Sequence, residues 1–249
     1  MRISDVHDEL RDWWNRDAHT YDDSPSHAAS DPVEAAAWRS ALRRALPAPP
    51  ARVLDAGAGT GSMSLLAAEL GYRVTALDLS EGMLSQAERK AAGRGIDLDL
   101  VHGPAHEPPE GPFDAVMERH LIWTAPDPVE ILRAWRRVTA DGGRLVMFEG
   151  SWGSSGPVDR LREASTHIFR RVYGIEHDHH DEYRPELRER LPLSNMAGPG
   201  PLIESIVRAG WKAVRLARLR DVEWARREIA PPVLRWLEAE PMWVLVADA

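Results

Sequence analysis

The chain has 249 residues, with 39 acidic and 31 basic side chains, a formal net charge of −8, ten tryptophans and no cysteine. The missing cysteines exclude disulfides, thiolate metal sites and cysteine nucleophiles, and the acidic balance argues against nucleic acid as a partner. The polar start MRISDVHDEL is unlike a signal peptide, and no apolar run approaches the ~20 residues of a membrane helix. We therefore expect a soluble, cytoplasmic, single-domain protein, either a monomer or a homodimer.

Two helices are expected in the first fifty residues. The first covers about residues 6–16, and the second covers about residues 32–46, with Asp31 as N-cap and Pro32 at the first helical position. The segment between them, residues 15–30, is polar. It is interpreted either as a linker between the helices or as a lid over a ligand site.

A glycine-rich turn follows the first expected strand. The strand, residues 52–54, runs into Asp55 and then into GAGTG at positions 57–61, and a helix with apolar residues at helical spacing follows over residues 62–70. Glycines allow positive φ and let the backbone approach a ligand closely. The spacing is G-x-G-x-G with serine in sixth place, so the G-x-G-x-x-G pattern of dinucleotide sites is not matched.

The second expected strand, residues 72–78, ends in an acid. Asp78 lies close to 20 residues beyond the turn, where a doubly wound fold places the carboxylate that holds both ribose hydroxyls. The alternative is a strand-end acid in solvent. Ser80 is placed to cap a helix over residues 80–92, from which Met83 would lie against an adenine.

Expected strands and helices continue to alternate over residues 97–149. The sequence predicts strands over residues 97–102, 113–117 and 144–149 and a helix over residues 129–139. Because ligands bind beyond the carboxyl ends of parallel strands, Arg119 and His120 should share a crevice with Asp55 and Asp78. His120 is the first choice for a base or substrate-orienting group. The alternative is that both residues only shape the pocket.

Residues 151–201 leave the alternating pattern of strands and helices. They contain an expected helix over residues 158–173, the run HDHHDE within residues 177–182, and a proline- and glycine-rich loop over residues 191–201. The histidines and acids invite a metal hypothesis, but a solvated polar turn is favoured, so no metal is predicted. An intermediate interpretation is that one or two of these histidines face the substrate.

Several segments resemble the class I S-adenosylmethionine (SAM) dependent methyltransferases of the ubiquinone/menaquinone-like branch. The run D-x-G-x-G-x-G from Asp55 resembles their motif I, and Trp14, Ala18, Tyr21 and Asp22 resemble their W-x(n)-A-x-x-Y-D lid segment. The sequence RHLIWT after the fourth strand is also similar. The resemblance is specific over about residues 51–149 and weak over residues 151–201.

The resemblance implies an α/β fold. We expect a Rossmann-like, seven-stranded, mostly parallel sheet with helices on both faces, an antiparallel C-terminal hairpin and helical lid elements. The domain then divides into a lid (1–50), a SAM-binding core (51–150), a substrate cap (151–201) and a C-terminal part of the sheet (202–249). In this last part the sequence predicts helices over residues 202–209 and 223–237 and strands over residues 212–219 and 242–247.

The resemblance also implies that the cofactor is SAM. Family members usually continue the third strand with G-D-A, whose aspartate bonds the adenine amino group, but here Pro104 takes its place. The Ala105 N–H, with His106 or Glu107, is the expected replacement. The residues that the resemblance assigns to the cofactor are Tyr21, Asp55, Gly57, Ala58, Gly59, Gly61, Asp78, Leu79, Met83, Ala105, His106 and Arg119.

The expected activity is methyl transfer to a nitrogen or oxygen of a small molecule, in secondary metabolism. Alternatives are C-methylation of a quinone-like or other apolar acceptor, and SAM binding without methyl transfer. The candidate acceptor-binding residues are Trp14, His27, Trp123, Trp152 and His180, and the candidate catalytic residue is His120.

Overall fold

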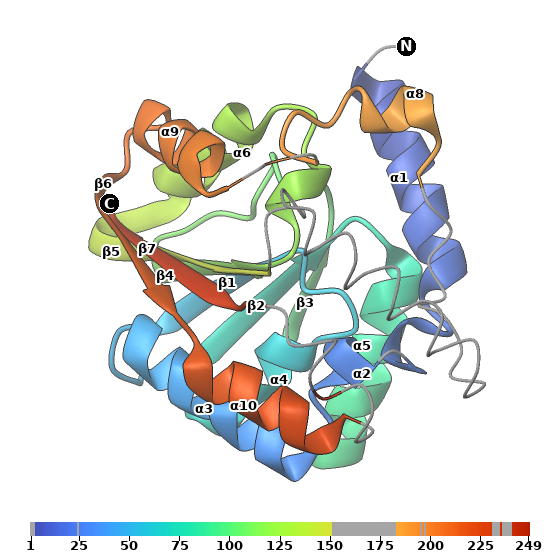
Figure 1. Ribbon diagram of the computed structural model, residues 1–249, viewed down its shortest axis with the longest axis vertical. Helices are drawn as coiled ribbons and strands as arrows, with labels where there is room; N and C mark the ends of the chain where they lie inside the picture. Colours follow the sequence, from blue (N-terminus) through green and yellow to red (C-terminus); the bar gives the residue numbers. More distant parts are fainter. Residues whose placement is uncertain are drawn as a thin grey trace.

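The computed structural model describes residues 3–23, 25–150, 183–194, 196, 198–230, 235 and 241–249, and in this part of the chain seven strands form one sheet. Their order is β3-β2-β1-β4-β5-β7-β6 (Figure 1). The strands are β1 (Arg52–Ala56), β2 (Arg73–Asp78), β3 (Asp99–His102), β4 (Phe113–Arg119), β5 (Thr139–Glu149), β6 (Lys212–Arg218) and β7 (Trp243–Asp248).

The first five strands are parallel, and β7 is antiparallel to both of its neighbours, β5 and β6. The predicted sheet and its antiparallel C-terminal pair are therefore confirmed. Strand β1 pairs with β2 on one side and with β4 on the other. The strand order thus runs in opposite directions on the two sides of β1. In such sheets ligands bind in the crevice beyond the ends of the strands at this reversal, here β1 and β4.

Helices lie on both sides of the sheet, with α3, α4, α5 and α10 on one side and α6 and α9 on the other (Figure 1). The described helices are α1 (Ile3–Asp17), α2 (Pro25–Ala28), α3 (Pro32–Ala45), α4 (Ser62–Glu69), α5 (Glu81–Arg94), α6 (Pro128–Val138), α8 (Pro185–Arg188), α9 (Gly200–Arg208) and α10 (Arg220–Ile229), with 3₁₀ turns η1 (Tyr21–Asp23) and η2 (Ile122–Thr124).

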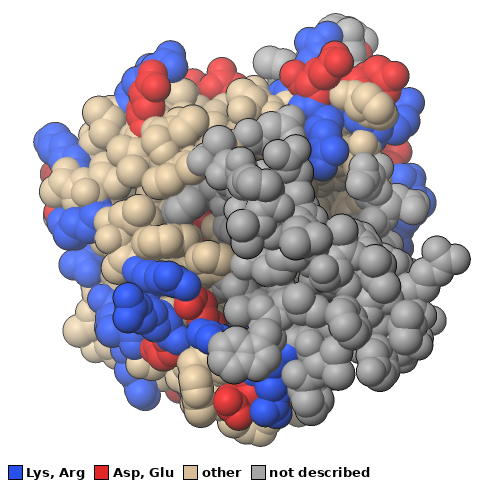
Figure 2. All heavy atoms as spheres, viewed as in Figure 1, with Lys and Arg blue, Asp and Glu red and all other residues tan. Residues whose placement is uncertain are grey.

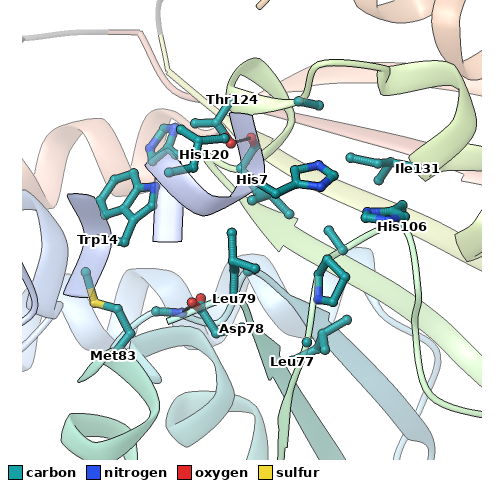
Figure 3. A pocket seen from close by; sticks show the side chains of 18 of the residues that line it. His7, Trp14, Leu77, Asp78, Leu79, Met83, His106, His120, Thr124 and Ile131 are labelled. Atoms are coloured by element: carbon teal, nitrogen blue, oxygen red, sulfur yellow. Dashed lines mark hydrogen bonds between the residues drawn. The ribbon is translucent and has the colours of Figure 1, made fainter. Parts of the chain in front are cut away.

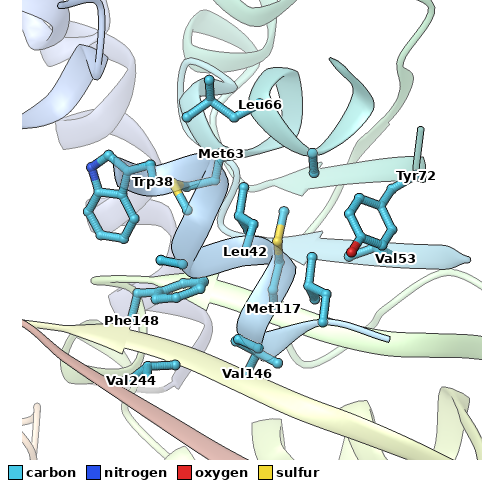
Figure 4. Packing of buried hydrophobic residues seen from close by; sticks show 14 of the residues in the cluster. Trp38, Leu42, Val53, Met63, Leu66, Tyr72, Met117, Val146, Phe148 and Val244 are labelled. Carbon is cyan, nitrogen blue, oxygen red and sulfur yellow. The ribbon is translucent and has the colours of Figure 1, made fainter. Parts of the chain in front are cut away.

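Side chains of successive strand residues enter two separate cores. Val53 and Phe148 belong to the core under α3 and α4, whereas Leu54 and Met147 belong to the core under α6 and α9. This alternation follows from the two-residue period of a strand, and it explains why strands buried on both faces read as continuous apolar runs. Figure 4 shows the first core, where Trp38 of α3 lies near Phe148 of β5 with ring centroids 5.5 Å apart.

Several predicted helix starts are confirmed by their caps. The carboxylate of Asp31 accepts from the Val33 and Glu34 N–H groups, the Ser80 hydroxyl accepts from Met83 N–H, and Asp127 accepts from Glu130 N–H. These bonds satisfy N–H groups that have no partner inside the helix.

Some boundaries differ from the prediction. The helix expected over residues 129–139 ends at Val138, and β5 begins at Thr139, with a register shift against β4 that leaves room for the turn around Gly142. The segment 15–30 is not an open loop, because it contains the η1 turn and α2. The helix expected over residues 158–173 and the 177–182 run lie outside the described residues.

The described surface carries both signs of charge. In Figure 2 acidic and basic side chains of the α1 and α8 region lie together near the upper right edge, where Arg184 pairs with Glu9. No helix in the described ranges is long and apolar enough to cross a bilayer.

Candidate active site

The glycine turn sits at the end of β1 and is held by the neighbouring strand. The N–H groups of Gly57 and Ala58 both donate to the Leu77 carbonyl at the end of β2, at 2.8 and 3.0 Å. Gly57 has φ +71°, and a Cβ there would lie 2.9 Å from the Leu121 side chain. A larger residue at this position would be strained in backbone and in packing, so this glycine is required by the geometry of the turn.

Asp78 connects the turn to the next strand. Its Oδ2 accepts from Gly59 N–H and its Oδ1 from Ser80 N–H, both at 2.8 Å. Burial raises the pKa of Asp78, while these two backbone N–H bonds oppose the rise. The side chain also lines the main cavity. Its remaining lone pairs are therefore available to neighbouring hydroxyl groups of a ligand.

The main cavity lies beyond the carboxyl ends of β1, β2 and β4, and it has about 830 Å³ of empty space open to solvent. Figure 3 shows Trp14 and His120 toward one side of the view, His106 and Ile131 toward the other, and Asp78 between them. The predicted residues that line it are Trp14, Tyr21, Gly57, Gly59, Asp78, Leu79, Met83, Ala105, His106, Arg119 and His120.

A smaller cavity of about 290 Å³ has Tyr21, Gly57, Gly59 and Arg119 in its lining, and these four residues also line the main cavity. Predicted residues Asp55 and Ala58 line the smaller one as well. The glycine turn thus lines both spaces.

A partly buried cation, Arg119, and a buried acid, Asp55, both line the smaller cavity. Asp55 accepts from the Ser64 hydroxyl at 2.5 Å, and burial raises its pKa to about 6. Arg119 donates through Nη2 to the His27 carbonyl at 2.6 Å and lies over the Trp38 ring. Its Nη1 is buried and has no acceptor among the described residues. Such an unsatisfied guanidinium nitrogen is suited to an anionic group of a ligand in this cavity.

The N-terminal segment closes over the turn through two polar connections. At the first, the side-chain oxygen of Asn15 accepts from the Ser80 hydroxyl and from Gly82 N–H at the start of α5. At the second, Asp22 accepts from the Thr60 hydroxyl and from the Lys90 ammonium, both at 2.7 Å. We call this second connection the Asp22 clasp. It supports Tyr21, whose ring lies beside the turn.

The far side of the cavity, near Ala105, carries two histidines. His106 stacks on His7 of α1 with ring centroids 4.6 Å apart. Burial, followed by the neighbouring His106, lowers the pKa of His7. Ala105 is fixed because its carbonyl accepts from the Trp135 indole N–H at 2.8 Å. The side of the cavity around Pro104 is therefore formed by rings and by a fixed backbone segment.

His120 lies directly after β4 in a backbone conformation that is uncommon for a residue with a side chain. Its φ is +61°, and its N–H donates to the Phe148 carbonyl of β5. Its Nδ1 lies 3.4 Å from Oε2 of Glu149, a buried residue at the end of β5. Left-handed conformations of non-glycine residues cluster at functional sites because the surrounding structure must hold them.

Three predicted site residues lie just outside the cavity linings. His27 stacks on Tyr21 with ring centroids 4.2 Å apart, and its Nδ1 donates to the Tyr21 carbonyl at 3.0 Å. Trp123 lies 5.6 Å from the Tyr183 ring. Gly61 is the N-cap of α4, and a Cβ there would meet Ala87 of α5. Trp152 and His180 lie outside the described residues, which contain no metal-like cluster of three His, Asp or Glu side chains.

Sequence reasoning missed His7, Leu10, Leu121 and Ile131 as lining residues, and it missed the two glutamates behind His120. The glutamates had a usable signal, since each stands at the end of a strand and the two strands are neighbours. The helix that carries His7 was expected, but nothing in its sequence says which element it packs against.

Residues 54–147 match the family model described as a methyltransferase domain. The order and directions of the seven described strands are those of the class I SAM-dependent methyltransferase fold. The cofactor of proteins with this domain is SAM.

The curated relatives support the same family at moderate identity. The chain is 39% identical over 123 residues to a demethylmenaquinone methyltransferase of Renibacterium salmoninarum, covering 48% of this chain and 50% of the relative. It is 36% identical over 141 residues to a ubiquinone biosynthesis O-methyltransferase of Xanthomonas campestris, covering 54% of each. The chain thus spans about half the length of the curated relatives it matches.

Solved structures show the same fold at low identity. A phosphoethanolamine N-methyltransferase 2 of Haemonchus contortus, solved with S-adenosylhomocysteine, superposes with a TM-score of 0.57 and 17% identity over 84% of this chain and 52% of that one. A protein of Nostoc punctiforme described as a putative O-methyltransferase superposes with a TM-score of 0.58 and 16% identity, over 95% of this chain and 60% of the other.

Proposed function

We propose that this protein transfers the methyl group of SAM to a nitrogen or oxygen of a small molecule, as a step of secondary metabolism. The observation that carries the proposal is a pair of cavities that share four lining residues. Asp78, the glycine turn, Arg119 and His120 line the main cavity, and the turn and Arg119 also line the smaller one. This arrangement suits a long ligand with a sugar in the middle and a charged amino acid at one end. We also propose that the compartment is the cytoplasm.

The chemistry of the lining residues fits the parts of SAM. Asp78 is the acceptor for the two ribose hydroxyls, with its carboxylate already aligned by two backbone N–H groups. The unpartnered Nη1 of Arg119 would hold the methionine carboxylate in the smaller cavity. Met83 and Leu79 provide the apolar contact for the adenine. Tyr21 contributes an aromatic ring, which favours a neighbouring sulfonium cation.

The protein's own part in transfer is binding, alignment and proton handling. SAM, when bound, supplies an electrophilic methyl group on a sulfonium. The walls formed by α1, η1 and the strand ends would hold both partners in line. His120, the catalytic candidate, faces the same cavity and would take the acceptor's proton. Trp14 lies on the same side of the view as His120 in Figure 3 and is the proposed aromatic wall for the acceptor.

A second candidate is C-methylation of a quinone-like acceptor. The name of the Renibacterium relative favours it, and the apolar residues Leu10, Leu121 and Ile131 in the lining would suit an apolar ring. A third candidate is SAM binding without methyl transfer. It is supported by Pro104, which takes the place of the aspartate that bonds the adenine in the family. A panel of acceptors separates the three candidates.

The first test is native mass spectrometry of the purified protein, followed by titration with S-adenosylhomocysteine. Bound SAM or S-adenosylhomocysteine is the expected result, and a protein that takes up neither would overturn the proposal. Methyl-labelled SAM is then offered with panels of amines, phenols and quinols. Label on nitrogen or oxygen supports the first candidate, label on carbon the second, and binding without label in any product the third.

A further inference from the structure

Two buried glutamates lie behind His120 at the ends of neighbouring strands. Glu118 closes β4 and Glu149 closes β5, with exposed fractions of 0% and 4%. Strand alternation places Glu118 on the same face as Val116 and Glu149 on the same face as Met147, and both of these apolar residues belong to the core under α6 and α9. The two side chains therefore lie on one face of the sheet, at the ends of paired strands.

Each glutamate has one atom with a clear partner. Oε2 of Glu118 accepts from Leu121 N–H at 2.8 Å, and Oε2 of Glu149 lies 3.4 Å from His120 Nδ1. The other oxygen of each, Oε1, is buried and has no hydrogen-bond donor in the described part of the chain. A buried unsatisfied oxygen is costly. One proton held between the two carboxyl groups supplies the donor that they lack.

The electrostatics agree with a shared proton. Burial, and then the charge of Glu149, raise the pKa of Glu118 well above its usual range. Burial also raises the pKa of Glu149, while hydrogen bonding with Glu118 opposes the rise. Two adjacent buried carboxyl groups do not both ionise near neutrality, and they titrate as one unit.

We propose that Glu118 and Glu149 are a positioning pair that retains one proton between them, so that Glu149 accepts the Nδ1–H of His120 and turns Nε2 toward the acceptor as the base. This inference rests on the proposed function for its catalytic meaning. Neither glutamate lines the main or the smaller cavity. The pair acts through His120, whose backbone conformation and bond to Phe148 hold the ring between the pair and the cavity.

The proton and electron balance of the step is simple. The acceptor's lone pair forms the new bond to the methyl carbon, the S–CH₃ electron pair stays on sulfur, and the acceptor's proton goes to His120 Nε2. The imidazolium is then next to a pair with net charge −1. When the product leaves, the proton passes to water. The base implies an acceptor that carries a hydrogen on the reacting atom, such as a phenol, an enol or an N–H group.

Other ionisable groups face the same cavity and bear on its pH dependence. Tyr21 of η1, Asp78 of β2, Arg119 of β4, His7 of α1 and His106 of the loop after β3 all line it. Of these, only Arg119 is adjacent to His120 in the chain. A readout specific to His120 is therefore needed.

The test is nitrogen-15 NMR of the full chain with labelled histidine and added S-adenosylhomocysteine, with the His120 signal assigned by its loss in His120→Gln. We expect the neutral ring to carry its proton on Nδ1, whereas free histidine favours Nε2. Glu149→Leu should move the proton to Nε2, while Glu149→Gln, which still offers an oxygen to Nδ1, should retain it. Glu118→Gln replaces the shared proton with a permanent amide donor, so the His120 proton should again stay on Nδ1.

A wild-type His120 with its proton on Nε2, or one unaffected by Glu149→Leu, would overturn the inference. If Glu149→Leu does not fold, the wild-type and Glu149→Gln tautomers still decide the question. Because this readout needs no methyl transfer, a protonated Nδ1 in a protein that methylates nothing would refute the proposed function and leave the pair intact. With an acceptor identified, Glu149→Gln should move the acidic limb of the kcat profile to lower pH without changing KM for SAM.

Discussion

The two ends of the cavity are built in different ways. At the cofactor end the main contacts are a glycine turn and one acid, Asp78, which lie within about 25 residues and are bonded to each other through backbone N–H groups. At the acceptor end Trp14, His120 and Glu149 come from three distant parts of the sequence. Backbone groups keep their chemistry when side chains change. Substitutions at the cofactor end should therefore weaken cofactor binding, because they remove a few essential hydrogen-bonding atoms. Substitutions at the acceptor end should instead slow the reaction, because they disturb its alignment.

The largest expected effect is at the cofactor end. Asp78→Ala removes a carboxylate that would bond two hydroxyls and that also holds Gly59 and Ser80. Hydrogen bonds to charged groups contribute about 1.5–3 kcal/mol each, so affinity for S-adenosylhomocysteine should fall at least ~100-fold. Isothermal titration calorimetry measures this. Asp141→Ala, an exposed acid in the described turn within β5, is the matched control. A dissociation constant within threefold of wild type in Asp78→Ala would remove Asp78 from the ribose site.

The next effect is at the acceptor end. His120→Ala should lower kcat by about 100-fold, the low end of what general base catalysis contributes, while the affinity for S-adenosylhomocysteine stays within threefold. This separation of kcat from cofactor affinity is what the difference between the two ends predicts. His19→Ala, which changes an exposed histidine of the N-terminal segment, serves as control. Turnover equal to wild type in His120→Ala would exclude it as the base.

Asp55 gives a pH-dependent test of the cofactor end. Burial raises its folded-state pKa to about 6 from a reference of 3.8. The folded protein therefore binds more protons than the unfolded chain between these values, and stability falls as pH rises through that window. Between pH 5 and pH 7 the loss should be about 1 kcal/mol. Urea unfolding of wild type and Asp55→Asn measures it. A wild-type-minus-variant difference that is equal at both pH values would contradict the buried state of this carboxyl group.

The smallest effect concerns the Asp22 clasp. Asp22→Ala breaks the contacts with Thr60 and Lys90. Partly exposed ion pairs contribute about 0.2–1 kcal/mol, so affinity for S-adenosylhomocysteine should weaken by no more than about fivefold. Glu69→Ala breaks ion pairs with Arg39 and Arg94 elsewhere and should leave the affinity unchanged. Equal effects of the two variants would mean that the clasp does not support Tyr21 over the turn.

The difference between the two ends also explains what sequence reasoning achieved. The glycine turn, Asp78 and the caps at Asp31, Ser80 and Asp127 are local patterns, because their partners lie within a few residues or one strand away. Periodicity identified all seven strands of the described sheet, although it missed the start of β5, where the chain turns from helix to strand without an intervening loop.

Long-range contacts were not accessible in the same way. The stacking of His7 on His106 depends on how α1 lies across the cavity, and the helix pattern fixes only which face is apolar. His27 was expected at the substrate, yet it stands behind Tyr21 and receives a bond from Arg119, a residue 92 positions away. The meeting of Glu118 and Glu149 required the strand order β4-β5 together with the burial of both ends.

The attachment of the N-terminal segment has an evolutionary consequence. Trp14 and Tyr21 enter the cavity from a part of the chain that precedes residues 54–147, the region that matches the family model. This segment is joined to the core near the cofactor by Asn15 on α5 and by the Asp22 clasp. Exchange of Trp14 and its neighbours in this segment would change the walls around the proposed acceptor position while the glycine turn and Asp78 remain as they are. Mutation and recombination can in this way change the substrate specificity of such a protein while its binding site for the methyl donor stays the same.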